Sequence, residues 1–374
     1  MIPDIQQIKV YYRDQLAGTL QLAPDGSRCV FEYDRGWLAN GFSLSPLELP
    51  LQEGLHFADP GKFDGDFALF EDSLPDGYGL YLLDKILHGM NSSLAETTPL
   101  QRLALVGKAG MGALTYLPEI PSRYQRPALS TDDLDQLQEK ALAVLAEKSE
   151  EDVKLLYYNS ANSGGARPKV VLKREDGSRW LVKFRHLSDA PDIGAREFLY
   201  MQTAEECGIE IPRIALIQGK YFAAERFDID RRGERFHAVT AAALLKSDFR
   251  QQSLDYTQLL ALTGYLTQDP AQVEEMFRRM VFNLIADNKD DHGKNFTFLY
   301  DGRWRLSPAY DLTYVPKGPG GEHATSLFYH GNPGLEMVVK AGMEIRITRS
   351  RCLEIIDKVQ QTCRKNLPSI IFLR

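Results

Sequence analysis

Two short stretches in the last third of the chain hold residue types that could transfer a phosphoryl group. In the octapeptide at residues 288–295, Asp290 and Asn295 stand five positions apart, and Tyr310-Asp311 follows further along the chain. This spacing is found in phosphotransferases between the Asp that faces the acceptor hydroxyl and an Asn that binds magnesium. Asp311 would add the second oxygen ligand that a magnesium ion needs. These residues predict a kinase.

The chain on both sides of the octapeptide predicts how it is held. An amphipathic stretch at 272–286 precedes it, and a strand-like run at 296–300 follows it. The pattern predicts a loop at the end of a buried helix, and loops on rigid elements are common places for catalytic residues. A short cluster of Asp, Asn and Gly is also typical of an ordinary polar turn. The kinase interpretation therefore needs support from the rest of the chain.

Composition limits the class of protein. A chain of 374 residues with 44% hydrophobic and 25% charged residues is long enough for two or three globular domains. The net charge of −7 argues against a large basic surface, so we expect no DNA binding by this chain alone.

The cysteines and the apolar runs predict the compartment. The four cysteines have the spacing of neither a zinc site nor a disulfide framework, and we expect them to be reduced and partly buried. No run approaches the roughly 18 apolar residues of a membrane span. We expect a cytoplasmic protein without a membrane segment.

The first part of the chain predicts a β-rich subdomain. Short strands are expected at 5–12, 19–22 and 28–33, and helical spacing predicts helices at 80–90 and 99–106. The glycine-rich run at 107–112 superficially resembles a phosphate-binding loop. Such a loop follows a strand and opens a helix, whereas here a helix precedes and a strand-like run follows, so a turn is the better interpretation.

A proline-rich linker at 118–127 and a helix at 134–147 lead into the second part. A small-residue loop at 160–169 then precedes strands at 170–173 and 180–184. Such a loop can lie over phosphates, although it is more often a flexible turn. Lys183 lies in the second strand, where it either faces solvent, as strand alternation favours, or grips a phosphate.

A helix at 194–207 carries Glu197 in its expected first turn. In protein kinases a helical glutamate after the lysine strand pairs with that lysine, but the helix dipole also favours a glutamate there. Strands at 214–217 and 221–227 lead to an expected hinge at 225–228, and the chain is then expected to be largely helical.

The order of these features reproduces the order of parts in the protein-kinase fold. The chain resembles the HipA family of bacterial serine/threonine kinases, the toxins of toxin–antitoxin pairs. The likeness rests on motifs at residues 163–169, 225–228, 290–295 and 307–312, and in the first part of the chain on residues 72–79 and 111–114.

The resemblance implies a role for each matching position. Asp290 would be the catalytic aspartate, His292 and Lys294 would lie beside the transferred phosphate, and Asn295 and Asp311 would hold Mg²⁺. A role for His292 in merely supporting the turn is an equal alternative. The remaining matching positions would contact ATP: Ser163, Gly164, Gly165, Ala166, Arg167, Pro168, Lys169, Lys183, Glu197, Glu225, Arg226, Phe227 and Tyr310.

The resemblance also implies regulation and partners. Members of the family phosphorylate a serine of their own glycine loop, which ejects the loop and blocks ATP, and Ser160 and Ser163 are the candidates here. Members usually bind a small helix-turn-helix antitoxin, HipB-like, that contacts DNA. Their known protein targets are aminoacyl-tRNA synthetases.

We therefore predict an α+β protein with a protein-kinase-like, two-lobed core behind an N-terminal β-rich subdomain. The expected division is 1–120 for the subdomain, 121–230 for the N-lobe and 231–374 for the mainly helical C-lobe. The predicted activity is transfer of the γ-phosphate of ATP to a protein serine or threonine. Two alternatives stay open: a small-molecule or lipid kinase, because residues 290–295 also resemble the phosphoinositide-kinase loop, and a catalytically inactive nucleotide-binding partner protein.

Overall fold

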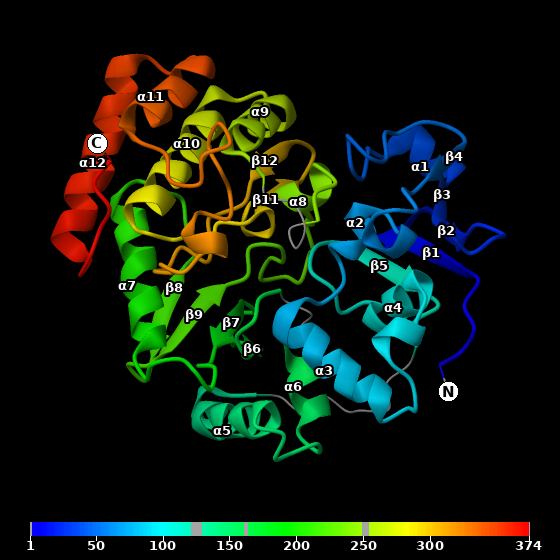
Figure 1. The fold of residues 1–374 in the computed structure, drawn as a ribbon. Coiled ribbons are helices and arrows are strands. Elements are labelled where there is room, and N and C mark those ends of the chain that lie inside the picture. Colours follow the sequence, from blue (N-terminus) through cyan, green and yellow to red (C-terminus); the bar gives the residue numbers. More distant parts are fainter. Residues whose placement is uncertain (1, 121–128, 161–163, 249–253, 374) are drawn as a thin grey trace. The chain divides into compact units, whose positions relative to one another are not determined.

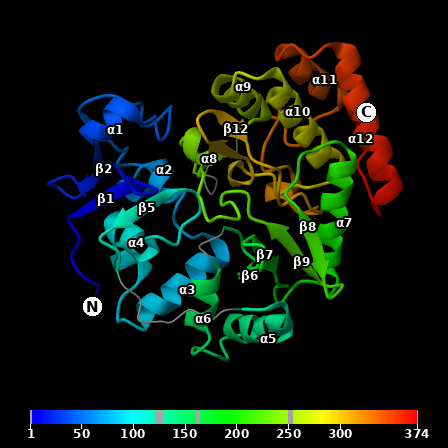
Figure 2. The same ribbon diagram turned by 180° about the vertical axis from the view of Figure 1, so that it is seen from behind.

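The computed structural model describes residues 2–120, 129–160, 164–248 and 254–373. The chain forms two compact units (Figure 1; Figure 2). The first unit is Met1–Pro191 with Asp228–Val239, and the second is Asp192–Phe227 with Thr240–Arg374. The chain therefore passes between the units three times.

An antiparallel sheet opens the first unit. Its strands are β1 (Gln7–Tyr12), β2 (Gln15–Leu22), β3 (Cys29–Tyr33), β4 (Leu55–Phe57) and β5 (Leu114–Leu117), in the order β4-β3-β2-β1-β5. The three strands expected at the start of the chain are confirmed. Alternate residues Ile8 and Val10 of β1 are fully buried, and Leu20 and Phe31 on the neighbouring strands are buried with them. This alternation gives the sheet one core face.

Short helices complete the first half of this unit: α1 (Arg35–Asn40), α2 (Ala68–Glu71), α3 (Gly77–His88) and α4 (Pro99–Val106). The last two confirm the helices expected there. Thr98 and Gln101 form a capping box on α4, and Gly107 ends the helix with a φ of 52°. The glycine-rich run after α4 leads into β5 and opens no helix, which confirms the interpretation as a turn.

The rest of the first unit contains α5 (Leu134–Leu145), α6 (Val153–Asn159), the antiparallel pair β6 (Lys169–Lys173) and β7 (Arg179–Lys183), and most of β10 (His237–Thr240). The helix expected at 134–147 is confirmed, while α6 was not predicted. Most of the expected linker lies outside the described residues.

One buried histidine of the first unit makes its stability depend on pH. His237 is fully buried, and its Nε2 lies 2.7 Å from the carbonyl oxygen of Leu44. Burial lowers the pKa of His237 to about 4, although the Leu44 carbonyl partly opposes this shift. The folded protein therefore holds this imidazole neutral.

We expect the free energy of unfolding to fall as the pH is lowered from about 6.5 to about 4. The unfolded chain binds a proton near the ordinary pKa of histidine, whereas folded His237 binds it only near the lower value. The difference in the pKa of His237 between the unfolded and the folded state corresponds to about 3 kcal/mol of folding stability. This stability is fully present above about pH 6.5. Denaturant unfolding at several pH values in this range measures the change in stability. His237→Asn is the variant, and His88→Asn, at an exposed position, is the control. An unchanged pH profile in His237→Asn would contradict the assignment.

The second unit is mainly helical. It contains α7 (Ile193–Glu206), β8 (Ile214–Ile217), β9 (Tyr221–Glu225), α8 (Ala241–Leu244), α9 (Tyr256–Thr267), α10 (Pro270–Ile285), β11 (Thr297–Tyr300), β12 (Trp304–Leu306), α11 (Leu335–Glu344) and α12 (Arg349–Asn366). The elements expected in this part of the sequence are confirmed, with ends that differ by a few residues.

Helix α10 is the centre of the second unit. The side chain of Asp269 caps its first turn at 2.9 Å from the Ala271 N–H, and Pro270 occupies the first position, as predicted. From Met276 to Ile285 every residue except Arg278 is buried. Helices α9 and α12 lie alongside α10 in both views (Figure 1; Figure 2). The octapeptide therefore follows a buried helix, as predicted.

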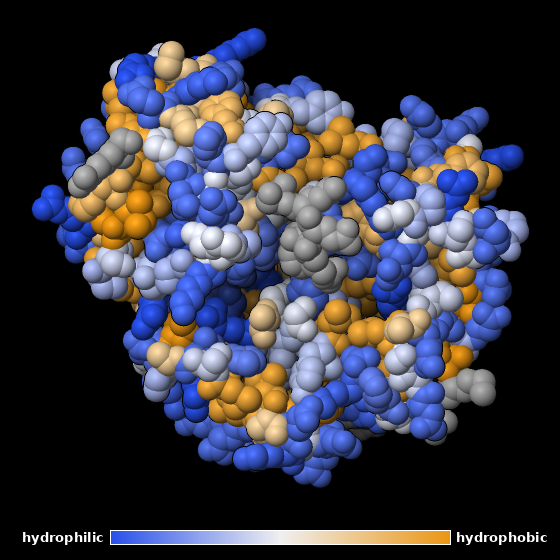
Figure 3. Space-filling view, in the orientation of Figure 1, coloured by the Kyte–Doolittle hydropathy of each residue, from blue (hydrophilic) through white to orange (hydrophobic). Residues whose placement is uncertain are grey.

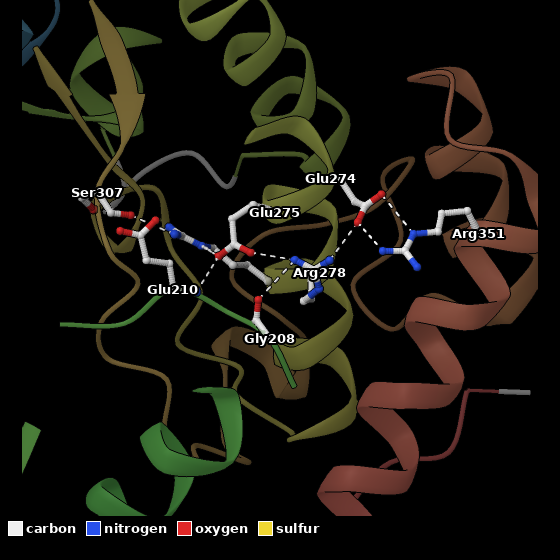
Figure 4. A network of polar contacts seen from close by, with 8 residues as sticks. Gly208, Glu210, Glu274, Glu275, Arg278, Ser307 and Arg351 are labelled. Atoms are coloured by element: carbon white, nitrogen blue, oxygen red, sulfur yellow. Dashed lines mark hydrogen bonds and ion pairs between the residues drawn. The ribbon is translucent and has the colours of Figure 1, made fainter. Parts of the chain in front are cut away.

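Charged side chains tie α10 to its surroundings (Figure 4). Arg351 of α12 donates hydrogen bonds to Glu274 at 2.8 and 3.2 Å. The buried Arg279 donates to Glu275 at 2.9 Å and to the carbonyl oxygen of Ser307 at 2.8 Å. Because Ser307 begins the segment that reaches Asp311, this buried pair fixes that segment against α10.

The surface and the cysteines agree with the composition. All four cysteines are free and buried. On the face drawn in Figure 3, hydrophilic side chains predominate and apolar side chains form several patches between them. In the described parts of the chain, no helix is both long enough and apolar enough to cross a membrane.

Candidate active site

The octapeptide forms the loop between α10 and β11. The side chain of Asp290 is 61% exposed. Asn295 ends a short 3₁₀ helix, and its Nδ2 donates to the carbonyl oxygen of Asp290 at 2.7 Å. Gly293 packs so closely that an added Cβ would lie 2.6 Å from a methyl group of Leu254. The fold therefore brings Asp290 and Asn295 together and leaves the Asp290 carboxylate exposed.

Other residues of the loop contact one another and the segment that ends in Asp311. The hydroxyl of Tyr310 donates to the carbonyl oxygen of Lys294 at 2.6 Å, and the ring of Tyr310 lies 5.6 Å from that of Phe227. The Nε2 of His292 lies 3.8 Å from a carboxylate oxygen of Asp290. Four residues expected to act on the nucleotide or the phosphate, Phe227, Tyr310, His292 and Lys294, are thus grouped around one loop.

Asp311 has an unusual backbone conformation. Its φ of 55° lies in the left-handed region, which side chains other than those of Asn and Asp rarely adopt. The Nδ2 of Asn288 donates to the carbonyl oxygen of Asp311 at 3.3 Å. Strained backbone of this kind is concentrated at functional sites.

A buried polar chain lies behind the octapeptide. Asn288 donates to Asn283 at 2.9 Å, Asn283 donates to the hydroxyl of Tyr256 at 3.0 Å, and Tyr256 donates to Asp291 at 2.6 Å. Burial, together with the adjacent Asp291 carboxylate, raises the pKa of the Tyr256 hydroxyl well above its ordinary value. No role was expected for these side chains from the sequence, because no motif marks a buried partner.

The small-residue loop at 160–169, the expected glycine loop, makes several contacts within the first unit. Arg167 binds Asp189 with two hydrogen bonds, at 2.8 and 3.1 Å. Burial favours a higher pKa for Asp189, but Arg167 and the His186 N–H outweigh it and hold that pKa below its usual value. The buried Lys169 donates to the carbonyl oxygen of Gly164.

The two candidate serines for autophosphorylation stand at the start of this loop in the sequence. Ser160 is buried, and its hydroxyl donates to the carbonyl oxygen of Tyr157 at 2.8 Å. Ser163 lies outside the described residues. In the middle of the loop, the carbonyl oxygen of Gly165 accepts a hydrogen bond from the N–H of Tyr78 at 3.1 Å, so the loop contacts the start of α3.

The remaining nucleotide candidates belong to different units. Lys183 is half-buried at the end of β7, in the first unit, next to the buried Val182 and Phe184. Glu197 and Glu225 belong to the second unit. Glu197 is 2% exposed and lies beyond the first turn of α7, because the helix begins at Ile193. The expected first-turn position of Glu197 is therefore wrong, and the helix dipole does not explain this buried carboxylate.

Asn295 and Asp311 offer the hard oxygen ligands that magnesium prefers. Because the amide nitrogen of Asn295 donates to Asp290, its amide oxygen is the atom that can bind a cation. Within the ranges that the structure describes, no three His, Cys, Asp or Glu side chains form a metal-binding group. Magnesium often takes only one or two protein ligands and completes its shell with water and substrate phosphates. The residues present fit an ion of this kind.

Comparisons with known proteins cover nearly the whole chain. The model of the HipA-like C-terminal domain matches residues 161–367, and that of the HipA N-terminal domain matches residues 8–117. The serine/threonine-protein kinase toxin HipA of Shewanella oneidensis is 22% identical over 347 residues, which cover 82% of this chain and 75% of that protein.

A solved structure shows the same fold. HipA in the complex of Shewanella oneidensis HipA, HipB and operator DNA superposes with a TM-score of 0.71 at 17% identity, over 98% of this chain and 92% of that one. The expected fold class, α+β with a protein-kinase-like core of the HipA type, is confirmed by this likeness.

Proposed function

This chain belongs to the HipA family, and we propose that it is an ATP- and Mg²⁺-dependent serine/threonine protein kinase. The observation that supports the proposal most is the hydrogen bond from Asn295 to Asp290. It holds the amide of Asn295, the proposed metal ligand, beside an exposed carboxylate. The proposal therefore assigns the reaction to the octapeptide and Asp311.

In the proposed reaction the carboxylate of Asp290 orients the acceptor hydroxyl and takes up its proton. The hydroxyl oxygen bonds to the γ-phosphorus while the bond from that phosphorus to the bridging oxygen breaks, and ADP leaves. Lys183 binds the phosphates, and His292 and Lys294 lie beside the transferred group. A bound Mg²⁺ on Asn295 and Asp311 would neutralise phosphate charge.

The family also supports proposals on partners and regulation. The Shewanella oneidensis structure contains HipA, HipB and operator DNA. We infer a HipB-like helix-turn-helix antitoxin, DNA contact only through that partner, a cytoplasmic location and a protein substrate, with an aminoacyl-tRNA synthetase as the class to test. Autophosphorylation would fall on Ser160 or Ser163, and at Ser160 the buried hydroxyl has first to leave Tyr157.

Incubation with γ-labelled ATP and Mg²⁺ tests the proposal. Label should appear on the protein itself or on a discrete protein band from a cell extract. Label confined to small molecules would instead support the small-molecule or lipid kinase. Nucleotide binding without any turnover would support the inactive partner protein. Mass spectrometry of the purified protein separates Ser160 from Ser163.

A lysine substitution tests the phosphate contact. We expect Lys183→Met to raise the KM for ATP and to lower kcat/KM by about 10²-fold, because one positive charge on the phosphates is lost. Lys173→Met is the matched control, since Lys173 is an exposed lysine on β6, the strand paired with β7. Steady-state kinetics with varied ATP measure both. Equal kinetics for the two variants would remove Lys183 from the site.

A further inference from the structure

Behind the octapeptide, one continuous run of hydrogen bonds joins two of the proposed reactive positions. It begins at Asn288, whose amide nitrogen donates both to the carbonyl oxygen of Asp311 and to Asn283. It continues through Asn283 and Tyr256 and ends on the carboxylate of Asp291, the residue after Asp290. The run thus connects the backbone at the proposed metal ligand with the backbone at the proposed base.

From Asn288 to Asp291 the hydrogen bonds all run in one direction. Asn283 and Tyr256 each accept one from the group before and donate one to the group after, and the last acceptor is the carboxylate of Asp291. Chains of this kind polarise one another and strengthen toward the charged end. Since Asn283, Asn288, Tyr256 and Asp291 are each at most 1% exposed, water does not compete for these bonds.

A second segment, which follows Asp311 in the chain, also contacts the carboxylate of Asp291. The Nδ1 of His323 lies 3.0 Å from Asp291, and the N–H of Thr325 donates to Asp291 at 3.2 Å. The hydroxyl of Thr325 donates to the carbonyl oxygen of Asp291. Asp291 therefore receives donors from α9 and from the segment after Asp311, which lie 35 and 32 residues away in the sequence.

A purely structural loop has no need for this arrangement. A buried carboxylate is costly to remove from water and requires several donors, whereas an apolar side chain would fill the same space at less cost. The donors here converge on Asp291, which lies between Asp290 and His292 in the sequence. Small displacements of a catalytic group, of about 1 Å, cost about 10²-fold in rate.

We propose that Asp291 is a positioning residue of this site, through which Tyr256 and His323 hold the neighbouring Asp290 in the arrangement required for phosphate transfer. This inference rests on the proposed kinase function. It assigns no contact with substrate to these three side chains. Their loss should therefore lower kcat and leave nucleotide binding unchanged.

Tyr256→Phe is the first test, because it removes one hydroxyl and keeps the packed ring. Tyr265→Phe is the matched control, since Tyr265 lies on the same helix and is 58% exposed. We expect Tyr256→Phe to lower kcat for labelled phosphate transfer by about 10- to 100-fold with an unchanged KM for ATP, while Tyr265→Phe stays at the wild-type value.

Two substitutions of His323 separate the hydrogen bond from the packing. Asn can place an amide N–H close to the position of Nδ1, whereas Ala cannot. We expect His323→Ala to lower kcat as Tyr256→Phe does, and His323→Asn to restore most of it. Loss of kcat in both variants in proportion to lost stability, or no loss in either, would overturn the role of His323.

Amide hydrogen exchange separates this inference from the kinase proposal. Tyr256→Phe should speed exchange in peptides that cover residues 288–295 and leave peptides of α12 unchanged. If the wild-type protein transfers no phosphate, the kinase proposal fails, and faster loop exchange still supports the positioning role. Wild-type kcat together with wild-type loop exchange in Tyr256→Phe would overturn the inference itself.

Discussion

Replacing Asp290 with Asn should lower phosphate transfer from ATP by about 10²- to 10⁴-fold. Asn keeps the shape of the side chain but cannot accept the proton of the acceptor hydroxyl. Because the side chain is 61% exposed and Asn295 bonds to the main chain of Asp290, the loop should keep its structure. Transfer of label from γ-labelled ATP, measured under single-turnover conditions, gives the loss directly.

The stability of Asp290→Asn should match that of the wild type to within about 0.5 kcal/mol. Asp357→Asn, at an exposed position of α12 far from the octapeptide in sequence, is the matched control for the change in charge. Full activity of the Asp290 variant would remove this residue from the mechanism. A large fall in its unfolding midpoint would show that the carboxylate supports the fold.

Asp311→Asn should lower transfer by about 10²-fold or more and raise the Mg²⁺ concentration needed for half-maximal rate. A neutral amide is a weaker ligand for a hard cation than a carboxylate. Titration of Mg²⁺ at saturating ATP measures the shift. An unchanged Mg²⁺ requirement would exclude Asp311 as a metal ligand.

The backbone at Asp311 decides which substitution is informative. At a φ of 55°, Asn is tolerated nearly as well as Asp, whereas Ala adds a cost of about 1 kcal/mol. We therefore expect both Asp311→Asn and Asp311→Ala to lose activity, while only the Ala variant unfolds at a lower denaturant concentration. Equal stability of the two variants would contradict the backbone argument.

Local signals in the sequence were sufficient for the elements that carry the site. Asp269 and Pro270 mark the start of α10, and the apolar run after them predicts a buried helix, so the octapeptide could be placed as a loop before β11. The turn after α4 was also predictable, because the order of helix and strand around it is wrong for a phosphate loop. The order of motifs then predicted the fold class.

The contacts behind the site were not predictable. Tyr256 and His323 meet Asp291 across 35 and 32 residues, and no spacing rule connects such positions. Helix α6 was missed because only seven residues form it, too few for helical periodicity to stand out from noise. The role of each site residue and the three-part division of the chain stay predictions.

The short insert Asp228–Val239 limits where the protein can be truncated. It belongs to the first unit although the second unit flanks it on both sides. Asp228 accepts from the N–H of Gly112 at 2.9 Å, and His237 bonds to Leu44. A truncated fragment starting at residue 161 would keep both buried side chains and lose the Gly112 N–H and the Leu44 carbonyl that they contact. Catalytic fragments cut at that boundary should be insoluble, and co-expression with the missing N-terminal piece should rescue them.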